Sequence, residues 1–527
     1  MLDVLIKNAL IYDGTGRAPY KADIGVLSAK IAVVAEGVND SAELTIEAGG
    51  LIAAPGFIDV HSHSEFSLTT HPEADSKLLQ GVTTEINGNC GFSAAPIYND
   101  AEQQLEKEFL LHKVQKRWHT FREYKEVLSE ARPAINFSTL TGQGNIRGSV
   151  LGYKNQEAES ADLAAMAALL RESVAHGSIG LSTGLIYSPG VFSTNAELVE
   201  LIKLSGVSPL IYATHMRSES DALIESIEDT IEIGRQTGIK VHISHLKTAG
   251  KQNWHKIDAV VSSIETAVSE GVKVTCDRYP YTASQTSLDT ALPSWTYEGG
   301  DAAELARLSN HGLLKQIKAE TAAFRDNDSY WKGVLVSAVT TEKNRHLEGM
   351  SIADAASTKG ASPIDFAIDL LVEERLHVDA IFFSMNEDNL RRILSMPVCM
   401  VGSDSSARPV AGHNGNGNNS GKPHPRGFGS FPRYLSKYVL SEGLIPLPEA
   451  IRKITMLPAQ TFGLKDRGVL RENAYADITL FDERTIRDTS EYASPWSAPE
   501  GIAYVFVNGR LAAKGGSPTA TRAGMVL

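Results

Sequence analysis

Short apolar runs that alternate with polar residues occur at both ends of the chain. Such runs occupy residues 4–6, 9–12, 31–34, 476–481 and 502–507. Their length and alternation are typical of β-strands. Asn508-Gly509, directly after the last run, is typical of a tight hairpin turn. We therefore predict a small β-sandwich domain formed by both termini, from residues 1–52 and 465–527.

Between these ends the pattern changes to strands that alternate with helices. Helices are expected at residues 161–176, near 219–236 and near 256–270, and strands near 179–181, 209–213, 241–244 and 272–276. From Ile211 to Ile243 and from Ile243 to Thr275 the chain makes two equal steps of 32 residues. A strand-plus-helix unit of this length indicates βαβ winding and therefore a parallel sheet.

This spacing fits either a doubly wound open sheet or a TIM-like (β/α)8 barrel. We favour the barrel because candidate metal ligands follow several of the predicted strands, and the carboxyl ends of barrel strands meet at one open face. The regular spacing is lost between about 289 and 380, where we predict an insertion within a barrel of residues 53–464. The Gly- and Asn-rich residues 411–420 are predicted to form a loop.

Composition and charge exclude several classes of protein. The chain has 527 residues, of which 42% are hydrophobic, enough for a large core. Its net charge of -13 argues against nucleic-acid binding and means that an anionic substrate needs locally placed cations. No apolar run is long enough to span a membrane, and the N-terminus does not resemble a signal peptide. The sparse, odd set of cysteines (Cys90, Cys276 and Cys399) favours a reducing cytoplasm.

The first candidate ligands are His61 and His63, at the end of an apolar run that starts at Pro55. Residues two apart on a strand face the same side, so both imidazoles can contact one ion. An isolated pair of this kind is more often structural, but the position at a strand end favours metal binding. Cys90 follows the next apolar run between two glycines. A lone cysteine is often only a small hydrophobic residue, but a thiolate at a strand end is a good zinc ligand.

His215 and His245 end two consecutive predicted strands and are 30 residues apart. Equivalent positions in adjacent βα units converge on the same axis, so both are predicted metal ligands. Asp404 ends a further strand that begins near Pro397. An aspartate before serines is often only a helix cap. Together with the other four elements, it is better interpreted as a general base.

These elements, in this order, resemble the amidohydrolase superfamily, and within it most closely the N-acyl-D-amino-acid deacylase (D-aminoacylase) family. The resemblance covers nearly the whole chain and depends on residues 55–63 (PGFIDVHSH), 88–93 (GNCGFS), 182–187 (STGLIY), 214–217 (THMR), 244–247 (SHLK), 279–281 (YPY), 402–404 (GSD) and 424–427 (HPRG). Together these motifs are highly specific.

The resemblance implies a zinc-dependent hydrolase that releases a carboxylate and a free D-amino acid from a small N-acyl-D-amino acid. It implies one tightly held zinc ion on Cys90, His215 and His245, and a weaker second metal position near His61, His63 and Asp404. In this family Asp404 would act as general base and acid, and His61 or His63 would stabilise the oxyanion or hold the second ion. The substrate-binding residues that we expect are Lys247, Tyr187, Tyr281, Ser287 and Met385.

Alternatives remain on the same fold. Hydantoinases and dihydroorotases bridge two metals with a carboxylated lysine, but the runs near 136–141 and 178–185 contain no lysine, which favours the deacylase branch. A cyclic-amide hydrolase or a dipeptidase is the main rival, and a non-catalytic scaffold is disfavoured because the chain keeps every candidate ligand. Arg278, Arg408 or Arg426 could face the site and select an acidic side chain.

Overall fold

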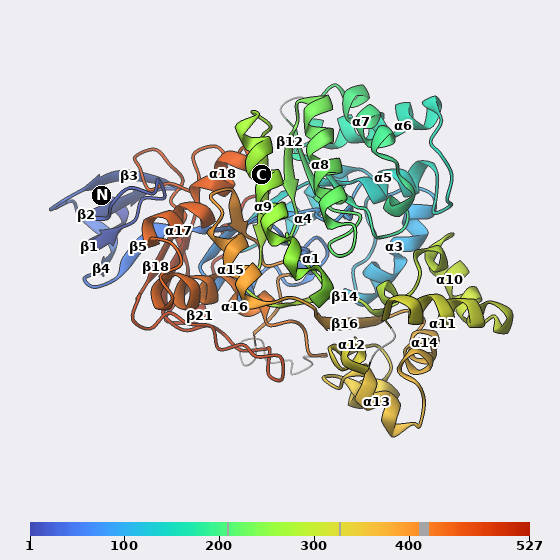
Figure 1. Ribbon diagram of the computed structural model, residues 1–527. Coiled ribbons are helices and arrows are strands. Elements are labelled where there is room, and N and C mark those ends of the chain that lie inside the picture. Colours follow the sequence, from blue (N-terminus) through green and yellow to red (C-terminus); the bar gives the residue numbers. More distant parts are fainter. Residues whose placement is uncertain (208–209, 326–327, 411–420) are drawn as a thin grey trace.

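The computed structural model describes residues 1–207, 210–325, 328–410 and 421–527 (Figure 1). The predicted loop at 411–420 and the first residue of the strand expected at 209–213 lie outside these ranges. The central part of the described chain contains eight parallel strands: β6 (Phe57–Asp59), β7 (Val82–Asn87), β8 (Asn136–Thr139) with its continuation β9 (Thr141–Gly142), β10 (Gly180–Gly184), β11 (Ile211–His215), β12 (Lys240–Ile243), β13 (Val274–Arg278) and β17 (Cys399–Val401).

The strands follow one another in sequence order around this part of the molecule. Strands β6, β7 and β8 form one sheet, and β9 to β13 continue to β17 in a second. Beyond the last and first strands, the Asp404 N–H donates to the His61 carbonyl at 2.8 Å, and Ser62 and Ser405 form a parallel bridge. This strand order, with helices between the strands, is the arrangement predicted for a (β/α)8 barrel.

Helices pack against the outer side of these strands, with α6 to α9 next to one another (Figure 1). They are α6 (Ser160–Ala175), α7 (Asn195–Ser205), α8 (Leu223–Thr237) and α9 (Ile257–Ser269), so the three helices predicted in this region are confirmed. In α8, Leu223, Ile227 and Ile231 recur every four residues and are buried, as expected for the core-facing side of a helix. In the described part of the chain, no helix has the length and apolar character needed to cross a bilayer.

Strands from both ends of the chain form one nine-stranded sheet, which Figure 1 shows beside the barrel. Its strands are β1 (Leu2–Ile11), β2 (Tyr20–Leu27), β3 (Lys30–Ala35), β4 (Ala42–Glu47), β5 (Ile52–Pro55), β18 (Ile478–Phe481), β19 (Ile502–Val507), β20 (Arg510–Lys514) and β21 (Ser517–Pro518). Ile6 and Ile24 share a core with Ile478 and Phe506, so the halves contributed by the two termini pack together. The domain boundaries themselves stay a prediction.

The hairpin expected at Asn508-Gly509 connects β19 to β20. Both residues have positive φ angles, 47° and 78°, which the tight turn requires and which asparagine and glycine tolerate.

Between β13 and β17 the chain forms a separate antiparallel sheet, where the sequence predicts an insertion. Its strands are β14 (Ala283–Ser287), β15 (Val334–Val339) and β16 (Val378–Phe383), accompanied by α10 (Asp301–Leu308), α11 (His311–Arg325), α13 (Ile352–Thr358) and α14 (Pro363–Glu373). These elements have their own core, which includes Leu308, Val336 and Leu371. Strand β14 begins before residue 289 and reaches the carboxyl ends of the barrel strands, so the insertion also contributes to the cavity there.

A fully buried lysine connects the first, second and last barrel strands. Lys77, in α2 (Asp75–Leu78), lies 2.8 Å from a carboxylate oxygen of Asp59 and 2.8 Å from one of Glu85. Its ammonium also donates to Ser403 Oγ and to the Ser405 carbonyl, both at 2.8 Å. Burial alone would lower the pKa of Lys77, but the two carboxylates raise it, so the side chain stays charged.

We expect Lys77→Met to destabilise the protein by about 3–5 kcal/mol, because it leaves Asp59 and Glu85 buried without a cation. Chemical denaturation followed by circular dichroism measures the change in the free energy of unfolding. Lys203→Met, at an exposed position of α7, is the control and should change stability by less than about 0.5 kcal/mol. Equal effects of the two substitutions would contradict the role of Lys77.

Candidate functional site

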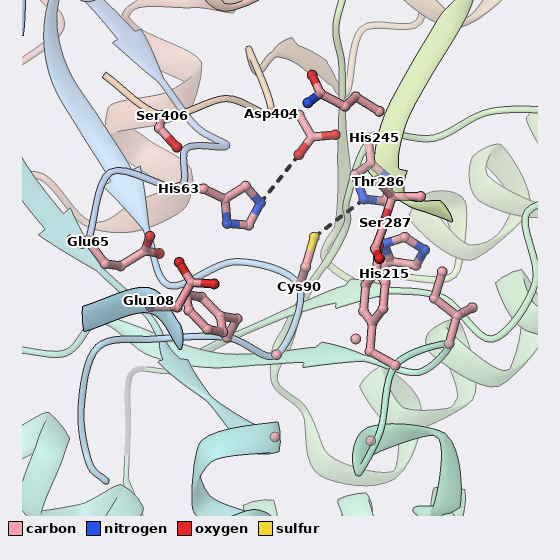
Figure 2. Close-up of a pocket in the computed structure, with 18 of the residues that line it drawn as sticks. His63, Glu65, Cys90, Glu108, His215, His245, Thr286, Ser287, Asp404 and Ser406 are labelled. Atoms are coloured by element: carbon pink, nitrogen blue, oxygen red, sulfur yellow. Dashed lines mark hydrogen bonds and ion pairs between the residues drawn. The ribbon is translucent and has the colours of Figure 1, made fainter. Parts of the chain in front are cut away.

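The predicted site residues come together at the carboxyl ends of the barrel strands, around one cavity of about 500 Å³ (Figure 2). His61 and His63 follow β6, Cys90 follows β7, His215 is the last residue of β11, His245 follows β12, and Asp404 follows β17. His63, Cys90, His215, His245 and Asp404 line the cavity. His61 is fully buried directly behind it.

Cys90, His215 and His245 form a first group that is able to hold a metal ion. One potential ligand atom from each lies within 4.8 Å of the others. Cys90 Sγ is 3.4 Å from His245 Nε2. Neither ring nitrogen of the buried His215 has a hydrogen-bond partner among the described residues. Because buried polar atoms are rarely left unsatisfied, these nitrogens fit a metal-binding role.

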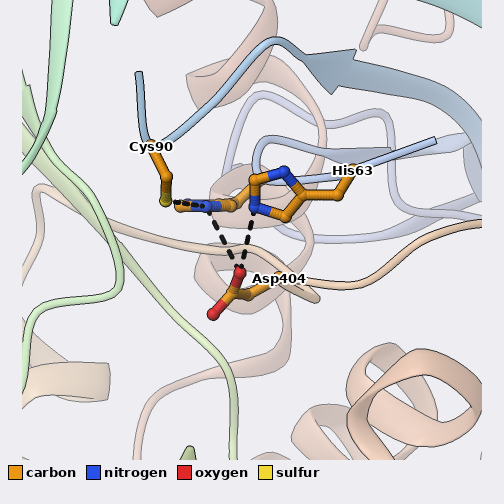
Figure 3. Close-up of side chains that lie close together, drawn as sticks. His63, Cys90 and Asp404 are labelled. Carbon is orange, nitrogen blue, oxygen red and sulfur yellow. Dashed lines mark hydrogen bonds and ion pairs between the residues drawn. The ribbon is translucent and has the colours of Figure 1, made fainter. Parts of the chain in front are cut away.

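His61, His63 and Asp404 form a second group together with the same cysteine. Cys90 Sγ lies 3.3 Å from His61 Nε2. Asp404 Oδ1 lies 3.3 Å from His63 Nε2 and 3.5 Å from His61 Nε2 (Figure 3). Cys90 therefore stands between two possible ion positions, and Asp404 borders the second of them.

Cys90 and Asp404 are held in the anionic forms that bind cations. Burial raises the pKa of the Cys90 thiol, but the imidazoles of His61 and His245 outweigh this and keep the pKa well below its usual value. Burial also raises the pKa of the Asp404 carboxyl, but the guanidinium of Arg426, 2.9 Å away, and the imidazoles of His61 and His63 outweigh this and hold the pKa well below its usual value. The negative field of this cluster therefore suits a divalent cation.

Burial and the nearby charges also shift the pKa values of the imidazoles. Burial lowers the pKa of His215, which favours the neutral form that coordinates metals. Burial acts in the same direction on His63, but hydrogen bonding to Asp404 and Cys90 raises its pKa to about 10. Protons on the imidazoles and a metal ion both compensate the negative charge of Cys90 and Asp404. Binding of a metal ion would therefore release protons here.

Three of the site residues have unusual backbone conformations. The φ angles of Cys90, His245 and Asp404 are 54°, 36° and 51°, in the left-handed region that non-glycine residues seldom adopt. Such conformations cost about 1–3 kcal/mol each and are kept where the surrounding structure fixes them, often at functional sites. Their coincidence here at three separate strand ends supports a functional role for this cluster.

Two carboxylates that sequence reasoning missed orient the candidate ligands. Asp277, at the end of β13, lies 3.1 Å from His61 Nδ1 and accepts a hydrogen bond from the His245 backbone N–H at 3.0 Å. Glu219 lies 2.7 Å from His245 Nδ1. Carboxylates that hold the second nitrogen of a histidine commonly fix the ring for metal binding. The sequence signals were weak: Asp277 is one residue beyond a predicted strand, and Glu219 is four residues after a ligand.

Three of the five predicted substrate-binding residues line the cavity, namely Lys247, Tyr187 and Ser287. Lys247 is buried, 2.5 Å from Glu219 and 2.9 Å from His245 Nδ1. The Tyr187 hydroxyl lies 3.1 Å from Thr286 Oγ1. These side chains therefore belong to the same site as the candidate metal ligands.

Tyr281 and Met385 lie outside the described residues that line the cavity. Tyr281 packs against the ring of His424, and Tyr279 lines the cavity instead, because the chain turns at Pro280 between the two tyrosines. Met385 contacts Arg278, whose guanidinium nitrogen is 2.7 Å from its sulfur.

The three candidate arginines also differ in whether they line the cavity. Arg408 and Arg426 line the cavity, whereas Arg278 is buried beside it and is not part of the lining among the described residues. Arg278 is therefore not placed to contact an acidic side chain of the substrate.

Comparisons with known proteins agree with this arrangement. The amidohydrolase family model matches residues 44–261 and 312–513. D-aminoacylase from Alcaligenes xylosoxydans xylosoxydans is 31% identical over 525 residues, which cover 100% of this chain and 97% of the relative. The crystal structure of N-acyl-D-glutamate deacylase from Bordetella bronchiseptica, complexed with zinc and a phosphonate inhibitor, is 32% identical with a TM-score of 0.85 and covers 100% and 99% of the two chains. A D-aminoacylase structure that concerns a binuclear metal centre is 30% identical with a TM-score of 0.82, covering 100% and 99%.

We expect Cys90→Ala to lose bound divalent metal, because it removes the ligand shared by both groups. The affinity should fall by at least about 10–100-fold, the range already seen when only supporting residues are changed. Metal content per chain after dialysis, measured by inductively coupled plasma mass spectrometry, tests this. Cys276→Ala, which changes a buried cysteine in β13, is the control and should keep its metal. A full metal content in Cys90→Ala would refute the assignment.

Proposed function

The chain belongs to the amidohydrolase family, and on that basis we propose that it hydrolyses the linear amide bond of N-acyl-D-amino acids. The products are a carboxylic acid and a free D-amino acid. The observation that carries this proposal is that Cys90, His215, His245 and Asp404 come together in a cavity. Buried cationic side chains line the same cavity. The D-configuration is supported by the relatives, which include D-aminoacylase and the N-acyl-D-glutamate and N-acyl-D-aspartate deacylases.

We propose Zn²⁺ as the metal, with one tight site on Cys90, His215 and His245. One thiolate and two imidazoles are a donor set that zinc favours, and they leave a coordination position for water or substrate. A weaker second site would use His61, His63 and Asp404. Zinc supplies Lewis acidity, which polarises an amide carbonyl and lowers the pKa of a bound water.

We assign the proton transfer to Asp404. Its carboxylate is ionised and lies beside His63, so it can accept a proton from the attacking water and deliver it to the departing amine nitrogen. In the free cavity Arg426 lowers the pKa of Asp404. A substrate carboxylate that draws Arg426 away would raise this pKa and make Asp404 a better base. His61 and His63 would stabilise negative charge on the carbonyl oxygen, unless they hold the second ion.

The carboxylate of the substrate requires positive groups and hydroxyls, which this acidic protein gathers on one side of the cavity. Lys247 and Arg426 supply the charge, and Ser287 supplies a hydroxyl. The buried hydroxyl of Tyr279 has no hydrogen-bond partner among the described residues, and its ring lies 4.6 Å from the Arg426 guanidinium. A bound carboxylate would satisfy this hydroxyl and both cations, which supports binding of the α-carboxylate at this position.

A cyclic-amide hydrolase is supported less well. The L-hydantoinase structure from Arthrobacter aurescens is 16% identical with a TM-score of 0.57, a likeness that concerns the fold alone. Neither β8 nor β10 contains the lysine that would bridge two metals in such enzymes. We further propose a small-molecule acyl amino acid as the partner and no binding of nucleic acid, which the net charge of -13 disfavours. A reducing cytoplasm remains our proposal for its compartment, on the basis of three free cysteines.

A substrate panel tests the proposed function. Purified protein is supplied with N-acetyl-D-methionine, N-acetyl-D-glutamate, their L-forms and dihydrouracil, and release of the amino group is followed. We expect D-substrates to exceed their L-forms by about 100-fold or more in kcat/KM, because inversion at the α-carbon misplaces either the carboxylate or the amide. Turnover of dihydrouracil alone would show that the protein is a ring-opening enzyme.

Asp404→Asn should keep its metal but lose about 10²–10⁴-fold in kcat, since an amide cannot accept the proton. Steady-state kinetics and metal analysis are carried out on the same preparation. Asp388→Asn, whose side chain is 95% exposed on α15 (Glu387–Ser395), serves as the matched control and should retain full activity. If Asp404→Asn retained wild-type kcat, another group would have to be the base.

A further inference from the structure

The cavity extends to both sides of the candidate metal ligands. Figure 2 shows Thr286 and Ser287 on one side of Cys90, with Glu65, Glu108 and Ser406 on the other. The first side holds these hydroxyls and His245, and Lys247 lies 2.9 Å from His245 Nδ1, so this is the side described above as carboxylate-binding. The second side is not used by the proposed mechanism.

A group of apolar side chains and one imidazole lies on this second side, where His112 Nε2 is 3.7 Å from a carboxylate oxygen of Glu108. Phe66, Phe92, Leu105 and His112, here named the aromatic arm, all line the cavity. The rings of Phe66 and Phe92 have centroids 6.1 Å apart, and the His112 imidazole stacks on Phe66 at 6.0 Å. Leu105 comes from α3 (Asp100–Leu111).

His112 contributes to this apolar wall because it is uncharged at neutral pH. Burial, and then the nearby guanidinium of Arg408, lowers its pKa to about 4. Glu108 and Arg408 also line the cavity with opposite charges, so the apolar character of this side depends on the packed rings of Phe66, Phe92 and His112. The aromatic arm therefore suits a neutral, apolar group.

The chemistry of the substrate determines which group enters the aromatic arm. The amide carbon joins the acyl chain on one side to the nitrogen of the amino acid on the other. With the α-carboxylate held by Lys247 and Arg426, the acyl chain extends away from them, past His63 and Cys90. We propose, on the basis of the proposed function, that the aromatic arm is an acyl-binding subsite and that the preferred acyl group is a bulky, neutral, aromatic one of phenylacetyl size rather than acetyl.

The size of the cavity agrees with this inference. Its volume of about 500 Å³ lies within the range of roughly 300–1,000 Å³ typical of pockets for drug-sized ligands. An N-acetyl amino acid, with roughly a dozen non-hydrogen atoms, leaves much of such a pocket unfilled. Each apolar carbon that fills the aromatic arm should raise kcat/KM by as much as about fourfold, which is the equivalent of one buried methylene.

The test is an acyl series on one D-amino acid: acetyl, propanoyl and phenylacetyl. We expect kcat/KM for phenylacetyl to exceed that for acetyl by about tenfold or more. Hydrolysis of the acetyl substrate with equal or lower rates for phenylacetyl overturns the subsite but not the proposed function. No hydrolysis of any acyl-D-amino acid, with metal bound, overturns the proposed function itself.

A variant tests whether the acyl preference arises in the aromatic arm. Leu105→Trp fills the aromatic arm and should lower the ratio of phenylacetyl to acetyl kcat/KM by about tenfold or more. Leu111→Trp, 65% exposed on the same helix, is the matched control and should leave the ratio as in the wild type. If Leu105→Trp alters the preference among amino-acid side chains and not among acyl groups, the aromatic arm binds the amino-acid side chain, and the proposal is wrong.

A measurement on the wild-type protein keeps the inference testable if Leu105→Trp does not fold. Phenylacetate and acetate are the acid products of the two substrates and bind without the amino-acid part. Phenylacetate should inhibit competitively at a concentration about tenfold or more below that of acetate. Equal inhibition by the two acids would refute the subsite.

Discussion

The concentration of buried negative charge at one end of the barrel is the constraint on which the rest of the site depends. The Cys90 thiolate, Asp404, Glu219 and Asp277 are all removed from water, where an isolated anion would be strongly unfavourable. Each of them is therefore paired with an imidazole, a guanidinium or an ammonium. This requirement brings Lys247 and Arg426 into a cavity of an otherwise acidic protein, and it prepares a place for a divalent cation.

The sequence was sufficient to predict that the six candidate ligand and base residues come together, because a repeating βα unit places every strand end at the same face of a barrel. His215 and His245 illustrate this most clearly, since their spacing alone indicates equivalent positions in adjacent units. What could not be predicted depends on side-chain direction. Tyr279 and Tyr281 are separated by one proline, and only the path of the chain after β13 decides that the first of them lines the cavity.

Long-range pairing explains the other features that the sequence did not reveal. Lys77 lies 326 residues before its hydrogen-bond partner Ser403, so no local pattern indicates their contact. Aspartates at strand ends are common, and nothing in the neighbourhood of Asp277 distinguishes a residue that orients two histidines. The antiparallel insertion was recognised only as a loss of spacing, and the contribution of its Thr286 to the cavity, beside the predicted Ser287, follows from how β14 packs.

The joining of both chain ends in one sheet has a consequence for synthesis on the ribosome. Strand β5 pairs with β18, which is translated about 420 residues later. At about 5–20 residues per second, β5 emerges roughly 20–80 seconds before its partner. During that interval the edge of β5 that pairs with β18 has no partner from this sheet, and an unpaired strand edge is a template for pairing with other chains.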